Sequence, residues 1–243
     1  LEIGQVVIMI HCGSRGLGHQ VATDYIEKIS GSGVGDGDLV YAPIKSDVGR
    51  EYFGAMACAA NFAFANKQVL THFVREEMKK YFDGFEAKVV YDICHNIAKF
   101  ERHGEKDVLV MRKGATRAFG PGRVEVPEDY REVGQPVLLP GSMGTPSYVM
   151  VGTKESESLA FGSCSHGAGR VRSRAEAHRV VTFKEACCDM EERGVFVEAG
   201  NKKGMVEESP SSYKDIDEVV RVCDEVGLAR KVVRLNPVLV VIG

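Results

Sequence analysis

The sequence predicts a mixed α/β protein, on three observations. Short runs rich in β-branched residues alternate with segments whose apolar residues recur at the helical period. Several of these runs end in clusters of Gly, His and Ser, and α/β proteins present their sites at such strand ends. No linker-like segment divides the 243 residues. We therefore expect one domain over residues 1–243, whose strands feed Gly- and His-rich loops at one central site.

The helices are predicted from periodicity and from their end signals. Gly18–Ser30 reads as a helix that ends at the glycine-rich loop Gly31–Gly37. A long helical pattern follows, with one apolar face. Its apolar positions are Tyr52, Met56, Ala59, Ala63, Leu70 and Phe73. His72 lies in the same pattern and is expected to be structural. Three further helices are predicted at Arg174–Arg179, Phe183–Arg193 and Ile216–Val226.

The strands are predicted from short lengths and β-branched content. They are Lys88–Ile93, Asp107–Met111, Pro136–Leu139, Ser147–Val151, Val195–Glu198 and a final strand or pair over Val232–Ile242. Between the second and third of these, Gly120–Pro127 is rich in turn residues and is predicted to be a surface loop.

Composition limits the classes of protein that the chain can be. No apolar run reaches about 18 residues, so no membrane span is expected. No secretory leader opens the chain, and we expect a cytoplasmic protein. Seven irregularly spaced cysteines argue against a disulfide framework or a zinc ribbon, and Cys187 and Cys188 are expected to be buried. The net charge of -3 does not suggest a nucleic-acid binder, although Arg112–Arg117 and Arg170–Arg179 are locally basic.

Residues 161–174, FGSCSHGAGRVRSR, combine what nucleotidyl chemistry needs. The His166 imidazole is a candidate nucleophile for phosphorus. Gly167 and Gly169 would let backbone N–H groups approach phosphate oxygens, and the arginines that follow would neutralise developing charge. The alternative is that the stretch is an ordinary glycine-rich turn beside a histidine.

Three more apolar runs lead into polar clusters. Val6–Ile10 leads into HCGSRGLGH, Val89–Ile93 into Cys-His-Asn, and Val137–Leu139 into PGSMGTPS. Four such junctions in one chain favour a functional site over coincidence.

Five segments resemble the RtcB family of RNA ligases. They are HCGSRGLGHQVATDY (11–25), YDICHNIAKFE (91–101), KGATRAF (113–119), GQPVLLPGSMGTPSYV (134–149) and SHGAGRVRSR (165–174). EESPSSYKDIDEVV (207–220) and RLNPVLVVIG (234–243) are similar too, so the resemblance covers nearly the whole chain.

The resemblance implies a GTP- and Mn²⁺-dependent ligase that joins RNA 3′-phosphate ends to 5′-hydroxyl ends. His166 matches the family's nucleophile, which accepts GMP from GTP and passes it to the RNA 3′-phosphate before the 5′-hydroxyl displaces it. A 2′,3′-cyclic phosphate end is first hydrolysed. The implied partners are GTP and broken tRNA or other RNA ends, without a membrane. An accessory activating protein is left open.

The resemblance also implies the metal ligands. His11 and His95 match two ligands of a site that holds two Mn²⁺ ions in the complete family member. The alternative is that both are hydrogen-bonded histidines at strand ends.

Further residues match the positions that hold the nucleotide or the RNA. The nucleotide positions are Asn96, Pro140, Gly141, Ser142, Met143, Ser147, Gly167, Ala168 and Gly169. Glu2 matches the acidic residue that reads the guanine edge. Candidates for RNA or triphosphate oxygens are Arg15, Lys113, Arg170 and Arg174. The alternative for these four is a solvated surface.

The chain departs from the family pattern in places that bear on activity. The family's chain is about twice as long, so the resemblance covers its C-terminal half. Ile242 stands where a nucleotide-contacting lysine is usual, and Ser165 where a cysteine is usual. Met111 and Gly120 replace a usual histidine and proline. With His11 and His95 as its only protein ligands, a metal would bind weakly.

Three hypotheses follow. The first is a GTP-dependent RNA ligase. The second is an incomplete, inactive remnant that binds guanine nucleotide or RNA. The third is a scaffold subunit of an RNA-processing complex.

Overall fold

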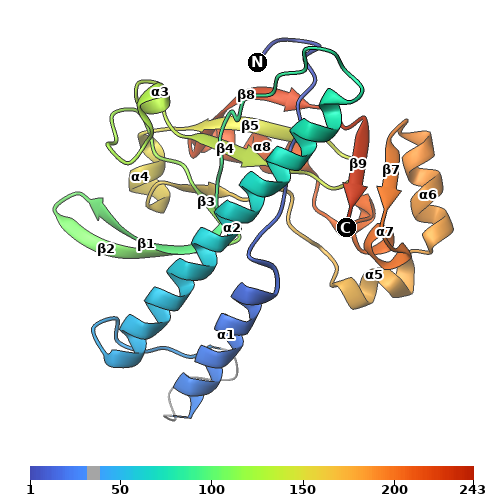
Figure 1. Cartoon of the computed structure of the whole chain (residues 1–243). Helices are drawn as coiled ribbons and strands as arrows, with labels where there is room; N and C mark the ends of the chain where they lie inside the picture. The colour runs from blue at the N-terminus through green and yellow to red at the C-terminus, as the bar shows by residue number, and fades with distance from the viewer. Residues whose placement is uncertain (32–38) are drawn as a thin grey trace. The chain divides into compact units, whose positions relative to one another are not determined.

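The computed structural model describes residues 1–31 and 39–243, which form two compact units. The helical unit is Gly4–Ala98, and the larger unit joins Leu1–Ile3 to Lys99–Gly243. Helices and several small sheets make the chain a mixed α/β protein, as predicted (Figure 1). The single catalytic domain over residues 1–243 stays a prediction. Of the predicted Gly31–Gly37 loop, all but Gly31 lies outside the described residues.

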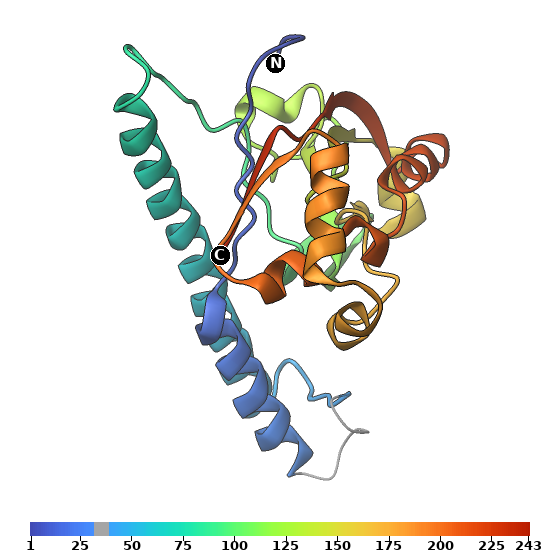
Figure 2. The same ribbon diagram turned by 90° about the vertical axis from the view of Figure 1, so that its right-hand side faces the viewer.

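Two helices dominate the helical unit and lie side by side in both views (Figures 1 and 2). They are α1 (Arg15–Ser30), which starts three residues before the predicted Gly18, and α2 (Asp47–Lys79). Ser46 caps α2, its Oγ accepting a hydrogen bond from Gly49 N at 3.2 Å. Small buried residues on α2, Ala59 and Ala63, allow close packing, whereas Phe73 of the predicted apolar face is exposed.

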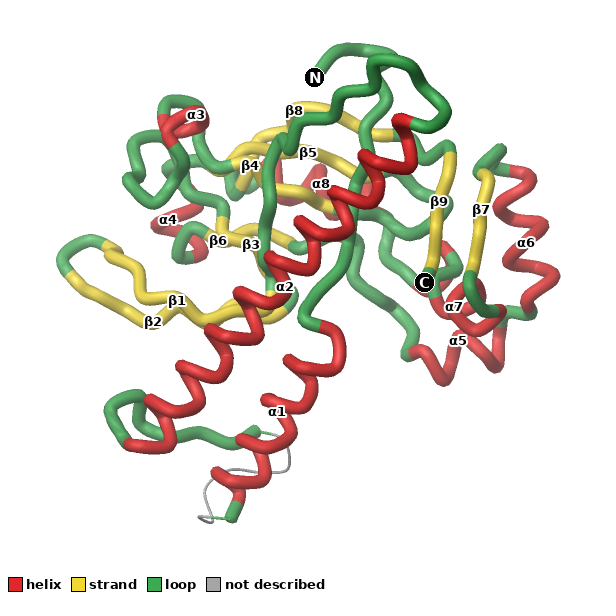
Figure 3. Tube along the Cα trace, viewed as in Figure 1, coloured by secondary structure: helices red, strands yellow, loops and turns green. Residues whose placement is uncertain are grey.

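The predicted strand Lys88–Ile93 is wrong: this segment is irregular, and so is the apolar run Val6–Ile10 before α1 (Figure 3). Side chains of α2 take the place of strand partners. Arg75 donates to the carbonyl of Ala87 at 2.9 and 2.6 Å, and Lys67 donates to that of Ile93 at 2.8 Å. These donors satisfy carbonyls that a sheet would otherwise pair, so β-branched content alone was misleading here.

The core of the larger unit is a three-stranded antiparallel sheet in the order β4–β5–β8. Its strands are β4 (Pro136–Leu139), β5 (Ser147–Gly152) and β8 (Ala229–Leu235). Helix α8 (Ile216–Glu225) supplies Ile216, Val220 and Cys223 to the same apolar cluster as Val137, Leu139 and Met150, since these helical positions recur at the 3.6 period. The first two strands and this helix confirm the predictions.

A second antiparallel pair joins β3 (Ala115–Arg117) to β6 (Ser163–Ser165), and neither strand was predicted. Beside them lies the hairpin of β1 (Asn96–His103) and β2 (Lys106–Lys113), of which only β2 was predicted. Short helices α3 (Glu128–Arg131) and α4 (Glu155–Ala160) follow β3 and β5. The predicted loop over 120–127 is confirmed, although Val126 within it is fully buried.

The remaining elements surround a second apolar cluster built on Met143, Ala186, Met190, Val195 and Met205. They are α5 (Arg174–Val180), α6 (Phe183–Glu192), β7 (Phe196–Ala199), α7 (Lys202–Glu207), the 3₁₀ turn Pro210–Ser212 and β9 (Leu239–Ile242). Strands β7 and β9 pair in parallel, so the predicted final pair is confirmed as β8 and β9 in different sheets.

Two composition-based expectations have different outcomes. Within residues 1–31 and 39–243, no helix is both long and apolar enough to cross a membrane. Cys188, expected to be buried, is exposed, while Cys187 is half-buried against the second cluster. Adjacent helical residues point about 100° apart, so both cannot face one core.

Candidate nucleotide site and histidine pair

His166 follows strand β6 directly, at the point where the chain leaves its pairing with β3. Ser165 pairs with Ala115, which places the preceding Gly114 beside the His166 ring. A Cβ on Gly114 would stand 3.3 Å from Cε1 and 3.4 Å from Nδ1 of His166. Gly114 also has φ +63°, a conformation that other residues rarely adopt. The glycine therefore provides the space in which the half-buried imidazole rests.

The glycine-rich turn after His166 packs against the loop that follows β4. Ala168 N donates to Pro140 O at 3.0 Å, and a Cβ on Gly167 would stand 2.5 Å from the same oxygen. Gly167 N donates to Ser165 Oγ at 3.4 Å. The first two N–H groups of the turn are thus used within the protein, and that of Ala168 joins the two predicted segments.

The loop 140–147 is braced by its own hydroxyl groups. Gly141 N donates to Ser147 Oγ at 3.2 Å, and Ser142 N donates to Thr145 Oγ1 at 2.7 Å. A Cβ on Gly141 would clash with Pro146 O, so only glycine fits there. The Met143 side chain is buried in the second apolar cluster, so a contact from this residue to a nucleotide would have to come from its backbone.

A cavity of about 770 Å³ adjoins this loop. Thr145 and Pro146 line it together with Tyr213, Asp215 and Arg234. Tyr213 is not among the predicted site residues, although it lies within the EESPSSYKDIDEVV motif. Burial and a hydrogen bond to the Glu208 carboxylate raise the pKa of Tyr213 to about 12, so its hydroxyl stays protonated at neutral pH.

The four candidate cations differ in what they already contact. Arg170 donates to the carbonyls of Glu207 at 2.7 Å and Arg172 at 2.9 Å and lies 4.9 Å over the Tyr213 ring, so it is largely structural. Arg174 is exposed and pairs with Glu207 at 3.1 Å. Lys113 is exposed in the larger unit, and Arg15 is exposed at the start of α1 in the helical unit, with φ 51°.

Cys164 does not replace the usual cysteine beside the nucleophile. It is 4% exposed, and its partner in the core is Cys223 of α8. A hydrogen bond with the Cys223 thiol and burial raise the pKa of Cys164, so it is a neutral core thiol.

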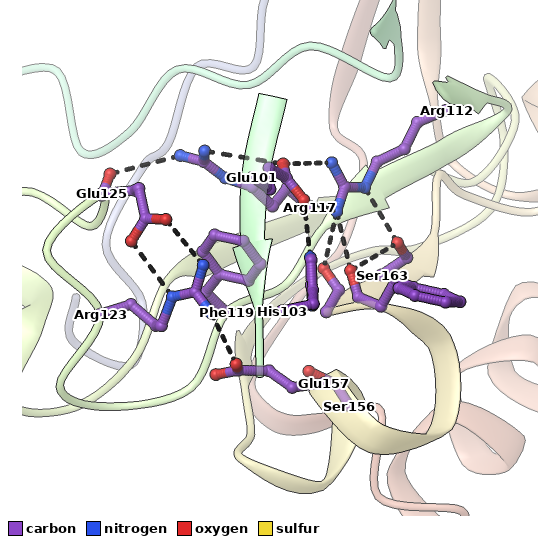
Figure 4. A network of polar contacts seen from close by, with 12 residues as sticks. Glu101, His103, Arg112, Arg117, Phe119, Arg123, Glu125, Ser156, Glu157 and Ser163 are labelled. Carbon is purple, nitrogen blue, oxygen red and sulfur yellow. Dashed lines mark hydrogen bonds and ion pairs between the residues drawn. The ribbon is translucent and has the colours of Figure 1, made fainter. Parts of the chain in front are cut away.

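A buried ion pair that the sequence did not suggest lies behind β6. Arg112 of β2 pairs in a bidentate manner with Glu101 of β1, at 2.7 and 2.9 Å (Figure 4). Burial raises the pKa of Glu101, but hydrogen bonds from Arg112 and His103 and the Arg112 and Arg117 charges outweigh it, and the net pKa is lowered. No sequence pattern indicated this pair, because the contact between Glu101 and Arg112 depends on the register of the β1–β2 hairpin.

In the helical unit, the structure brings the two predicted metal ligands together. His11 Nε2 and His95 Nε2 are 3.2 Å apart, and their rings meet edge to face at 76°. Helix α2 holds both flanking segments: Asn66 donates to Gly13 O at 3.1 Å, and Lys67 pairs with Asp92. Residues 84 positions apart in sequence therefore converge through one helix.

The donor set fits part of a metal site. Nitrogens 3.2 Å apart have the separation of neighbouring ligands on one ion, since metal–imidazole bonds measure about 2.0–2.1 Å. No third His, Cys, Asp or Glu joins them in a ligand group within the part of the chain that the structure describes. The geometry of the pair is compatible with two ligands of a larger set, and their role as metal ligands stays a prediction.

The other two candidates are exposed. Glu2 belongs to the larger unit, and Asn96 opens β1 directly after His95. The structure therefore groups His166 with the 140–147 loop and Gly167–Gly169, and separately groups His11 with His95.

Comparison with known proteins agrees with the sequence motifs. A family model described as tRNA-splicing ligase RtcB matches residues 1–243. Relatives of that name are 49% identical over 257 residues in Archaeoglobus fulgidus and 50% identical over 255 residues in Pyrobaculum aerophilum. These alignments cover 100% and 99% of this chain but 53% of each relative, so the chain spans about half their length. The chain belongs to the RtcB family of tRNA-splicing ligases.

Proposed function

We propose that the protein is a GTP- and Mn²⁺-dependent RNA ligase that joins 3′-phosphate or 2′,3′-cyclic phosphate ends to 5′-hydroxyl ends, acting on broken tRNA in the cytoplasm. The observation that carries the proposal is the placement of His166. It follows β6 directly with its ring against Gly114, beside a Gly- and Ser-rich loop braced by hydrogen bonds. This placement gives an immobilised nucleophile next to a loop suited to a nucleotide.

The chemistry proceeds in three displacements at phosphorus. A nitrogen of His166 attacks the α-phosphorus of GTP, forming an N–P bond and releasing pyrophosphate. An oxygen of the RNA 3′-phosphate then displaces His166 and takes up GMP. Finally the 5′-hydroxyl attacks the activated 3′-phosphate, loses its proton and releases GMP as the phosphodiester forms. A cyclic end is opened by water before the second step.

The residues of this chain orient and neutralise the reacting groups. Exposed Lys113, one residue before Gly114, is available to phosphate oxygens close to His166. Arg174 is exposed apart from its pair with Glu207 and can reach the RNA. His11 and His95 would hold Mn²⁺, which when bound would neutralise phosphate charge and help ionise an incoming oxygen.

The test is adduct formation by the full-length protein with α-³²P-labelled GTP and MnCl₂. We expect a labelled protein whose bond is acid-labile and alkali-stable, as a histidine phosphoramidate is. H166A should abolish labelling without lowering the melting temperature. H72A is the control, because His72 of α2 is exposed and is not among the predicted site residues.

Other outcomes point to the alternatives. GTP binding without an adduct would favour a nucleotide-binding remnant, and the absence of both would favour a scaffold role. Labelling that persists in H166A would refute the assignment of the nucleophile.

A further inference from the structure

We propose that Arg112, paired with Glu101, is a positioning residue that sets the place of His166 through the turn at Phe161–Ser163. This inference rests on the proposed function, in which His166 is the nucleophile. Both residues are 4% exposed, and Figure 4 shows Arg112 between Glu101 and Ser163.

The Arg112 guanidinium donates hydrogen bonds from all three of its nitrogens and so connects its own strand β2 with β1 and with the turn. Nη1 and Nη2 donate to the two carboxylate oxygens of Glu101. Nη2 also donates to Phe161 O at 2.9 Å, and Nε donates to Ser163 Oγ at 2.9 Å. A lysine has no planar fork and could not make these contacts together. Glu101 fixes the guanidinium plane, and the guanidinium in turn fixes the turn.

The turn needs such support because its backbone is unusual. Phe161 and Gly162 have φ 50° and +59°, two left-handed residues in succession, and the first carries a side chain. Arg112 places positive charge at their carbonyls, where helix α4 ends and its carbonyls lack helical partners. On the other side, a Cβ on Gly162 would clash with the Phe119 ring. The turn is therefore held on two sides.

The three residues of β6 lead from this turn to His166, and each of them pairs with a residue of β3. Ser163 is the first residue of β6 and pairs with Arg117, and Ser165 pairs with Ala115. Gly114, against which the His166 ring rests, is two residues after Arg112 in the same stretch of chain. One buried side chain thus fixes the strand that carries the imidazole and the segment that supports it. Misplacing a reacting group by about 1 Å can cost about 100-fold in rate.

Three variants of the full-length protein test the proposal. R112K keeps the charge and loses the fork, and S163A removes the acceptor of Nε while leaving the Glu101 pair. R221K is the matched control: Arg221 of α8 also makes a bidentate pair with a carboxylate, Glu218, at 2.8 and 2.6 Å, but it is exposed and belongs to a different element.

The first readout is the rate of labelled adduct formation at saturating GTP, measured beside the GTP dissociation constant. We expect R112K to lower the rate by about 10- to 100-fold. S163A should lower it less, R221K should match the wild type, and the dissociation constants should stay within about twofold of each other. A merely structural role would lower the active fraction and leave the rate of active molecules unchanged.

The second readout is the ring resonance of His166 in protein labelled with ¹³C-histidine, which does not depend on activity. R112K and S163A should move the resonance, and R221K should not. If the wild type forms no adduct, the proposed function fails, and the resonance alone decides the positioning claim. The positioning claim would be overturned if R112K and S163A fold, label at the wild-type rate and leave the His166 resonance unmoved. If R112K does not fold, the result for S163A decides the claim.

Discussion

The His166 ring lies against Gly114, where a single added methyl group would approach Cε1 to 3.3 Å. This distance is tighter than an ordinary van der Waals contact, so either the ring or the backbone would have to move. The position of the candidate nucleophile therefore depends on Gly114, a residue without a side chain that lies between β2 and β3. Several consequences of this arrangement can be measured.

Gly114→Ala should slow adduct formation by about tenfold or more, since the methyl group displaces the ring from its reactive position. Strain at φ +63° adds a stability cost of about 1–2 kcal/mol. Gly104→Ala is the control, because Gly104 has φ +59° in open space between β1 and β2. It should show the same strain in denaturant unfolding and a wild-type labelling rate. Equal rates in the two variants would contradict the steric argument.

Gly167→Ala should disrupt the contact between the His166 turn and the 140–147 loop. Its Cβ would stand 2.5 Å from Pro140 O, a backbone atom that cannot rotate away. We expect weaker GTP binding in calorimetry and a lower melting temperature, because the Ala168 N to Pro140 O bond is lost. Gly169→Ala has the left-handed strain of φ +67° without a neighbour and should retain more GTP affinity. The reverse order of affinities would show that the two loops are not coupled in this way.

Glu101→Gln should lower the free energy of unfolding at neutral pH by about 3–5 kcal/mol, since Arg112 would keep a buried charge without its counter-charge. The net pKa of Glu101 is lowered, so its contribution is present above the unfolded value of about 4.3 and is lost as pH falls through the lower folded value. The gap between wild type and variant should therefore shrink in acid.

Urea unfolding at pH 7 and at lower pH measures this gap. Glu218→Gln is the control: hydrogen bonding from Arg221 lowers the pKa of Glu218 too, but that pair is exposed, and its removal should change stability little. A gap for E101Q that does not change with pH would contradict the linkage.

His11→Ala and His95→Ala should each weaken Mn²⁺ binding by about tenfold or more, because each removes one of two nitrogens 3.2 Å apart. Electron paramagnetic resonance of free Mn²⁺ measures the affinity directly in the full-length protein. His72→Ala is the control: His72 is an exposed residue of α2, and the variant should bind Mn²⁺ as the wild type does. Unchanged affinity in both single variants would leave the pair as hydrogen-bonded histidines.

Local chemistry explains which elements the sequence could predict. Strand β4 has its predicted bounds, since it is short, apolar and followed by Pro140. Helix α8 repeats its buried residues at the helical period. Strand β6 could not be predicted, because SCS has no strand signal and forms one only by pairing with β3. Segment 88–93 shows the converse: it contains β-branched residues but is irregular, and Lys67 of α2 donates to its Ile93 carbonyl.

The amino-acid order alone determined the family, the candidate nucleophile, and the helices and strands whose periodicity is complete within a few turns or residues. Only the tertiary structure decided that His11 meets His95, that Gly114 supports His166, and that Arg112 and Glu101 are buried together. These contacts join residues from 11 to 84 positions apart. Such pairings depend on register, helix packing and the desolvation of charge, which short-range sequence patterns do not encode.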